Sequence, residues 1–241
     1  MITKSKAVLL AAALILVFQL TCCRKDEKDL YRNIRGMDPE FYSADDFKER
    51  ERELKAAIRE YRDILEMKIY AARNLGIYYK ILGKLYFDNR MYKLGAEAFD
   101  KAVEIDPENP ILFYYAGLCR ARYSKSVSGE ASAYAMLRLA EKNYLRAVEL
   151  DNNYTRAMYA LSVLYVFEMD KPDEAVELLE KLLEIEKYNF DAMFLLANSY
   201  IRMGLLDRAD RTYLRIINNA GDSSYRRQAE QNRNALRNFD L

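Results

Sequence analysis

The chain has 241 residues, of which 51% are hydrophobic, 31% charged and 12% aromatic, a composition typical of folded globular proteins. It contains no histidine, which excludes Ser-His and Cys-His nucleophile pairs and most zinc sites. Its 38 Lys and Arg residues against 37 Asp and Glu residues give a net charge of +1, so no global positive field favours nucleic acid as a partner.

The N-terminal residues have the layout of a secretory signal. Two lysines precede the apolar run from Ala7 to Leu20, in which Gln19 is the one polar residue. The run is shorter than the ~20 residues that span a bilayer, but it suits the apolar region of a signal peptide. Charged residues begin directly after Cys23. We therefore expect residues 1–22 to be a signal peptide that is removed.

The end of this segment, Leu20-Thr21-Cys22-Cys23, resembles the lipobox of bacterial lipoproteins. The resemblance implies that Cys23 is acylated, with palmitate among its lipids, and that a tether follows over residues 23–43. Several acyl chains hold a protein at a bilayer far more firmly than one chain does. We expect a protein anchored to the inner or outer membrane of a bacterial envelope and facing the periplasm. The alternatives are acylation of Cys22, which puts Gln19 in the Leu position, and a signal peptide or signal anchor without lipid.

One cysteine, Cys119, follows the processing site. A domain with a single Cys forms no internal disulfide, so we expect its stability to come from packing. Cys119 lies in the apolar run ILFYYAGLCRARY, which predicts a small buried side chain and not a reactive thiol.

Residues 44–75 contain no Gly or Pro and predict a long amphipathic helix. Ala57, Tyr61 and Ile64 repeat the spacing of the second helix of the repeat described next, so a degenerate half-repeat is the alternative. The apolar stripe of this helix consists of Phe47, Leu54, Ile58, Tyr61, Leu65 and Ala72.

The remainder of the chain is periodic, and its first unit covers residues 76–109. Two sets of small and large apolar residues recur at helical spacing, which predicts two helices that approach each other closely. The first set is Tyr79, Leu82, Gly83 and Tyr86, and the second is Gly95, Phe99 and Ala102. A turn is expected near Asn89, and Pro107 closes the unit. These offsets resemble the tetratricopeptide repeat (TPR), a 34-residue pair of helices.

Three further units follow at residues 110–153, 154–189 and 190–222, and the first of these is lengthened near Ser124–Ser132. Residues 223–241 predict a capping helix, because a terminal repeat otherwise exposes an apolar face. The resemblance implies an all-α fold. We expect a right-handed superhelical solenoid of about four TPR helix pairs, with a long N-terminal helix and a C-terminal capping helix.

In this family the first helix of each pair lines a concave groove. The resemblance assigns to that groove Lys80, Lys84 and Phe87; Tyr114, Leu118, Ala121 and Arg122; Tyr159, Val163, Val166 and Phe167; and Phe194, Asn198, Ile201 and Arg202. An apolar centre with charged ends suits a peptide, a partner helix or an apolar ligand. The alternative is that the groove is covered, by the Ser124–Ser132 segment, by the helix over 44–75, or by a second copy of the chain in a homo-oligomer.

The predicted function is that of a membrane-anchored scaffold in the cell envelope, which binds a protein or peptide partner, or an apolar ligand, as an accessory of a transport or assembly complex. The architecture resembles lipoproteins of outer-membrane assembly and of the pilotin type. It also resembles the TPR partners of periplasmic binding-protein transporters in spirochaetes. The alternative is a surface adhesin that binds host molecules. The carboxylate-clamp subfamily fits poorly, because Lys84 and Tyr115 stand where its pattern has Asn.

No sequence motif indicates catalysis. The chain has no Gly-rich phosphate loop, no calcium loop and no Cys-x-x-Cys pair. Acidic pairs such as Asp45-Asp46 fall at an expected helix start, where the positive end of the helix dipole stabilises negative charge. We expect neither enzymatic activity nor a cofactor or bound metal.

Overall fold

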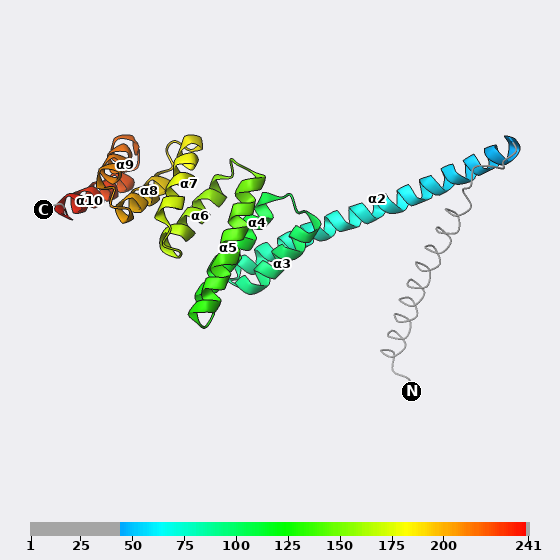
Figure 1. The fold of residues 1–241 in the computed structure, drawn as a ribbon, viewed down its shortest axis with the longest axis horizontal. Coiled ribbons are helices and arrows are strands. Elements are labelled where there is room, and N and C mark those ends of the chain that lie inside the picture. The colour runs from blue at the N-terminus through cyan, green and yellow to red at the C-terminus, as the bar shows by residue number, and fades with distance from the viewer. Residues whose placement is uncertain (1–43, 240–241) are drawn as a thin grey trace, which may run out of the picture. The chain divides into compact units, whose positions relative to one another are not determined.

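The computed structural model describes residues 44–239, with side chains over 47–236, and this part of the chain is helical with no strand. A first unit ends at Leu65 and a second begins at Glu66. The predicted signal peptide, Cys23 and the tether lie outside the described residues. The helices (Figure 1) are α2 (Ala44–Asp88), α3 (Tyr92–Ile105), α4 (Pro110–Tyr123), η1 (Ser124–Ser126), α5 (Glu130–Leu150), α6 (Thr155–Phe167), α7 (Pro172–Ile185), α8 (Phe190–Arg202), α9 (Leu206–Asn219) and α10 (Ser223–Phe239).

Helix α2 is continuous where a boundary was expected between residues 75 and 76. The long N-terminal helix and the first helix of the first repeat are therefore one element, because nothing before Asp88 stops it. The expected turn follows, with Arg90 at φ 60°. In the first unit, the apolar side chains from Phe47 to Leu65 expose 41–63% of their surfaces.

Helices α3 to α10 pack consecutively, each against the next along the chain. The pairs α4–α5, α6–α7 and α8–α9 lie within residues 110–153, 154–189 and 190–222. The two helices of a pair approach each other closely, as expected, at Gly83 and at Gly117. A Cβ on Gly83 would lie 2.9 Å from the ring of Phe99, and one on Gly117 would lie 2.6 Å from the ring of Tyr144. This arrangement confirms the predicted all-α solenoid.

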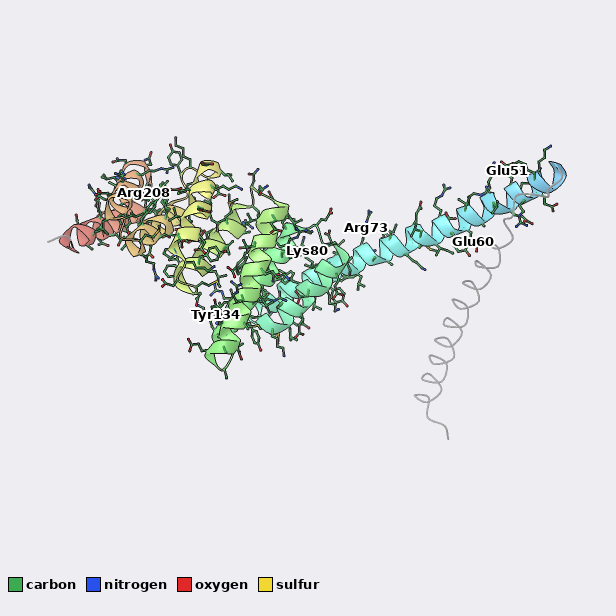
Figure 2. The ribbon with its side chains drawn as sticks, viewed as in Figure 1. Glu51, Glu60, Arg73, Lys80, Tyr134 and Arg208 are labelled. Atoms are coloured by element: carbon green, nitrogen blue, oxygen red, sulfur yellow. The ribbon has the colours of Figure 1, made fainter. Side chains whose placement is uncertain are left out.

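The lengthened second unit consists of the short helix η1 and an extension at the start of α5. Helix α5 has 21 residues, whereas α3 and α7 have 14. Gly129, at φ 89°, reverses the chain before α5 in a conformation that favours glycine. Tyr134 lies on the extension and is about half exposed (Figure 2).

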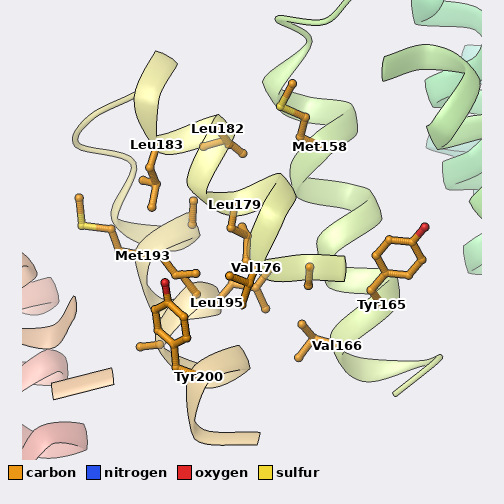
Figure 3. Packing of buried hydrophobic residues seen from close by; sticks show 14 of the residues in the cluster. Met158, Tyr165, Val166, Val176, Leu179, Leu182, Leu183, Met193, Leu195 and Tyr200 are labelled. Carbon is orange, nitrogen blue, oxygen red and sulfur yellow. The ribbon is translucent and has the colours of Figure 1, made fainter. Parts of the chain in front are cut away.

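The largest core joins α5 to α10, and side chains of α6, α7 and α8 meet at its centre (Figure 3). Its polar members are hydrogen-bonded, as buried polar groups require. Ser162 and Ser199 donate to backbone carbonyls one turn earlier, at 2.8 and 2.9 Å. Glu141, 6% exposed, accepts from Arg138 at 2.5 Å and lies 3.5 Å from the ammonium of Lys171.

Helix α10 covers the C-terminal end of the solenoid, as expected of a cap. Ala229 and Leu236 are buried against α9. The guanidinium of Arg233 donates two hydrogen bonds, at 2.7 and 3.1 Å, to the carboxylate of Asp210 on α9. The C-terminal cap is therefore held by both apolar burial and a bidentate ion pair.

Cys119 is fully buried between α3 and α4, with its sulfur near Gly95. Burial raises the pKa of its thiol to about 12. Since the thiolate is the reactive species, the side chain is a packing residue, as expected.

Candidate functional site

A cavity of about 580 Å³ lies in unit two, formed mainly by α4 and α6. These are the first helices of two successive repeats. The lining residues are Tyr114, Leu118, Ala121, Arg122, Lys125, Tyr144, Thr155, Arg156, Tyr159, Ala160, Val163, Leu164, Glu168, Glu186, Asn189 and Asp191. The volume is in the range of sites that hold small molecules or a few side chains of a peptide.

The middle of the cavity is apolar and aromatic. Leu118, Tyr159 and Val163 are half-buried there and pack against the main core. The Tyr114 ring makes an edge contact with Tyr154, with centroids 5.3 Å apart. Burial raises the pKa of both Tyr114 and Tyr159, so their hydroxyls are neutral hydrogen-bonding groups at physiological pH.

One end of the cavity holds the carboxylate of Glu186, and each of its two oxygens accepts a hydrogen bond from a neighbouring side chain. Thr155 donates to Glu186 at 2.5 Å, and the side-chain amide of Asn189 donates to the other carboxylate oxygen at 2.7 Å. Asn189 also caps α8 by accepting from the backbone of Ala192. The hydrogen bond from Thr155, and then that from Asn189, lowers the pKa of Glu186.

Replacing Thr155 with valine is expected to raise the pKa of Glu186 toward its ordinary value of 4.5. Because the folded-state pKa lies below the unfolded one, this hydrogen bond stabilises the fold at neutral pH, and the gain is lost as pH falls through the folded-state pKa. The cost at neutral pH should be below about 1 kcal/mol, since the carboxylate is largely solvated. Carboxyl NMR titration measures the pKa. Thr212→Val is the control and should leave it unchanged.

Two arginines line the cavity, and one of them, Arg156, is close enough to Glu186 for its charge to lower the pKa of that carboxyl. Among the described residues, no ion pair or hydrogen bond is recorded for the guanidinium of Arg122 or of Arg156. The third cation, Lys125, lies 3.2 Å from the carboxylate of Glu168. Arg122 is in the last turn of α4 and Arg156 in the first turn of α6, so an available positive charge borders the apolar middle on both helices.

The structure brings together only part of the predicted groove. The predicted residues that line the cavity are Tyr114, Leu118, Ala121, Arg122, Tyr159 and Val163. Phe167 is 55% exposed and lies under the guanidinium of Arg202, 5.7 Å from its ring centroid. Arg202 also pairs with Asp170 at 3.3 Å. Ile201 is half-buried beside this group and belongs to the margin of the core.

Val166 was expected in the groove, and this is wrong, because it is fully buried in the core of α6. It lies seven residues after Tyr159 and three after Val163, on the face that these two share, so its burial comes from the packing of the helices around the core and not from helical spacing. Phe194 is covered as well, since its ring lies 6.3 Å from that of Tyr225 on α10. The side-chain oxygen of Asn198 is buried without a hydrogen-bond partner among the described residues.

The residues predicted from the first repeat lie away from the cavity. Lys84 pairs with Asp88 one turn later at 2.5 Å. The ring of Phe87 makes edge contacts with Tyr92 and Tyr115, so it packs between repeats. Lys80 is partly exposed on α2.

The sequence interpretation missed the polar members of the cavity. They are Lys125, Thr155, Arg156, Glu168, Glu186, Asn189 and Asp191. Most lie at helix ends and in connections, where a repeat pattern gives no residue positions. The Asn189 position before an expected helix start was the one available signal, because Asn is a preferred N-cap.

Over the described range, no group of three or more Cys, Asp or Glu side chains is placed to hold a metal ion. None of the helices between residues 44 and 239 combines the length and the hydropathy that a bilayer crossing requires.

Comparison with known proteins identifies the repeats. Two family models described as tetratricopeptide repeat match residues 77–109 and 166–231. A TPR repeat-containing protein of Borreliella burgdorferi is 26% identical over 132 residues, which are 55% of this chain and 57% of that protein. RNA polymerase II-associated protein 3 of Mus musculus is 32% identical over 113 residues, 46% of this chain and 15% of that protein. The chain thus spans less than two thirds of either relative.

A solved structure agrees in fold. The crystal structure of YrrB, described as a TPR protein with an unusual peptide-binding site, superposes with a TM-score of 0.52 at 24% identity. The match covers 75% of this chain and 84% of that one. Residues 77–109 and 166–231 therefore match tetratricopeptide repeats, and the stacked helix pairs of the structure agree with that assignment.

Proposed function

We propose that the cavity between α4 and α6 binds a peptide segment of a partner protein, which makes the chain an interaction scaffold. The observation that carries the proposal is an apolar middle bordered by Arg122 and Arg156, whose guanidinium groups make no hydrogen bond or close ion pair among the described residues. Such a surface suits an extended segment with an apolar side chain beside a carboxylate, because arginine binds carboxylates with two parallel hydrogen bonds.

The acids of the cavity do not oppose this charge preference. Both oxygens of Glu186 already accept hydrogen bonds. Asp191 accepts from the hydroxyl of Tyr225 at 3.3 Å, and Glu168 faces Lys125. The segment therefore meets two arginines with free hydrogen-bond donors, of which Arg156 also interacts by charge with Glu186, and three carboxylates that have partners. Repeats of this fold are found in proteins with such roles, since YrrB is described by its peptide-binding site.

A photo-crosslinking amino acid at Val163, in the full chain in its native membranes, is expected to form an adduct with a partner protein. Tyr159→Glu should abolish the adduct, because it places a negative charge in the apolar middle. Arg156→Gln should weaken it and reduce its sensitivity to salt. The matched control is Tyr188→Glu, since Tyr188 is an exposed tyrosine outside the cavity. An adduct that survives Tyr159→Glu would contradict the proposal, and an adduct with a small apolar molecule would identify the ligand as non-peptide.

The proposal also includes the cell envelope as the site of action, with the chain held by acylation of Cys23. The support is the sequence of residues 1–23, an apolar run followed by a lipobox-like Cys. Metabolic labelling with an alkynyl palmitate analogue should modify the wild-type chain and the Cys22→Ala variant but not Cys23→Ala. Labelling that follows Cys22 would shift the anchor by one residue, and labelling of neither would remove it. Protease treatment of intact cells separates the periplasmic face from surface exposure.

A further inference from the structure

The two ends of the repeat array differ in how they are covered. Helix α10 buries the C-terminal end. At the other end, the part of α2 in unit two leaves large apolar side chains 53–69% exposed, namely Met67, Tyr70, Ile77, Tyr78, Ile81 and Leu85. A contiguous patch of this size on a soluble domain marks an interaction surface.

These side chains form one face of α2, opposite the face that packs on α3. Met67, Tyr70, Asn74, Ile77 and Ile81 alternate at spacings of three and four, the pattern of a helix–helix seam. Gly76 and Gly83 contact Ile105 and Phe99 of α3 and lie on the other side of the helix. Within the described part of the chain nothing covers the exposed face, which we call the α2 seam.

We propose that the α2 seam binds a second copy of this chain, with the two α2 helices antiparallel about a two-fold axis at Asn74. The six apolar side chains expose roughly 100–140 Å² each, or about 700 Å² in total. This is close to the ~800 Å² per partner that stable interfaces bury. A pair of α2 seams therefore supplies most of the area of a stable interface.

The order of residues along the helix fits a two-fold pairing. Antiparallel packing about Asn74 puts Met67 against the partner's Ile81, and Tyr70 against the partner's Tyr78. Asn74 then meets the partner's Asn74 on the axis, where two amides can hydrogen-bond to each other. A lone Asn in an apolar seam fixes the register of a helix pair at some cost in stability.

The charges beside the seam are complementary at Glu66 in the same register, whereas Arg73 lies near the partner's Arg73 close to the axis. Glu66 comes to lie between the partner's Lys80 and the partner's Lys84 on one flank, and Lys84 also pairs with Asp88 of its own chain. Lys80 and Arg73 extend from α2 (Figure 2), and no ion pair of Glu66 or Lys80 is recorded among the described residues. Glu66 and Lys80 are fourteen positions apart, about 21 Å along one helix, so they cannot pair within a chain.

Sedimentation equilibrium of the full chain in density-matched detergent micelles tests the pairing. We expect a dimer that dissociates on dilution. Ile77→Glu and Ile81→Glu should each raise the dissociation constant more than tenfold, because each buries a charge in the seam. Ile185→Glu is the matched control, since Ile185 is an exposed isoleucine on α7, and it should leave the constant unchanged. A chain that stays monomeric overturns the proposal. The proposal is also overturned if the seam binds a different protein and the chain itself does not dimerise.

A charge exchange tests the register separately. Glu66→Lys alone, or Lys80→Glu with Lys84→Glu, should weaken the dimer, and the three changes together should restore it. Restoration cannot arise within one helix, so it identifies contacts between copies. A dimer that is insensitive to all these changes uses another surface and overturns the antiparallel pairing. The cavity variant Tyr159→Glu should leave the dimer intact, which keeps this test independent of the proposed peptide site.

Discussion

Replacing Tyr144 with alanine is expected to lower the free energy of unfolding by about 3–5 kcal/mol, the range for loss of a large buried aromatic side chain. Tyr144 is 2% exposed in the second helix of its repeat. Its ring covers Gly117 of the first helix and lies 6.3 Å from the ring of Tyr114. The variant removes the side chain that joins the two helices, and urea denaturation followed by circular dichroism measures the loss.

A double-mutant cycle with Gly117→Val shows whether this contact is the cause. A Cβ at Gly117 would lie 2.6 Å from a ring carbon of Tyr144, so valine should destabilise the wild type by about 1–3 kcal/mol. In the Tyr144→Ala background the same valine enters vacated space and should restore stability. Additive effects would contradict the contact. Gly221→Ala is the control, because no atom lies within 4 Å of a Cβ there.

The repeat pattern predicted the fold because it encodes packing between neighbouring helices. Gly83 and Gly117 are small where rings of the next helix press against them, so their spacing carries three-dimensional information. The continuity of α2 was not predictable in this way. A period identifies faces that repeat, whereas the junction at residues 75 and 76 depends on the absence of any helix stop. The form of the lengthened second unit, a short η1 and an extended α5, is likewise set by local turn geometry at Gly129.

Some of the residues predicted for the groove line the cavity because of the helix face they occupy, and others do not because neighbouring helices cover them. Tyr159 and Val163 line the cavity as expected, because they share a face of α6. Phe194 occupies the equivalent face of α8, yet the ring of Tyr225 covers it. That contact joins residues 31 positions apart, and it depends on how α10 docks. Val166 shares the face of Tyr159 and Val163 by spacing, yet it is buried in the core, because packing against neighbouring helices decides its exposure.

Replacing Ala229 with aspartate is expected to release the capping helix α10, at a cost of about 3–5 kcal/mol. Ala229 is fully buried against α9, and a carboxylate there has neither space nor a partner. The loss of stability cannot exceed the free energy with which α10 docks on α9, because α10 can detach and the carboxylate then returns to water. Detachment exposes Tyr213 and Ile216, which are buried beneath it. Gln228→Asp is the control, since Gln228 is the exposed preceding residue on the same helix.

Hydrogen exchange measured by mass spectrometry locates the loss. Since each repeat of a solenoid contacts its neighbours only, faster exchange in Ala229→Asp should be confined to α8, α9 and α10. Exchange in α4 and α6 should stay slow, and the adduct formed at Val163 should persist, because at the cavity the release of α10 removes only the hydrogen bond from Tyr225 to Asp191. Uniformly faster exchange would mean that the array unfolds as one unit. In that case the cap stabilises the cavity as well as the end of the solenoid.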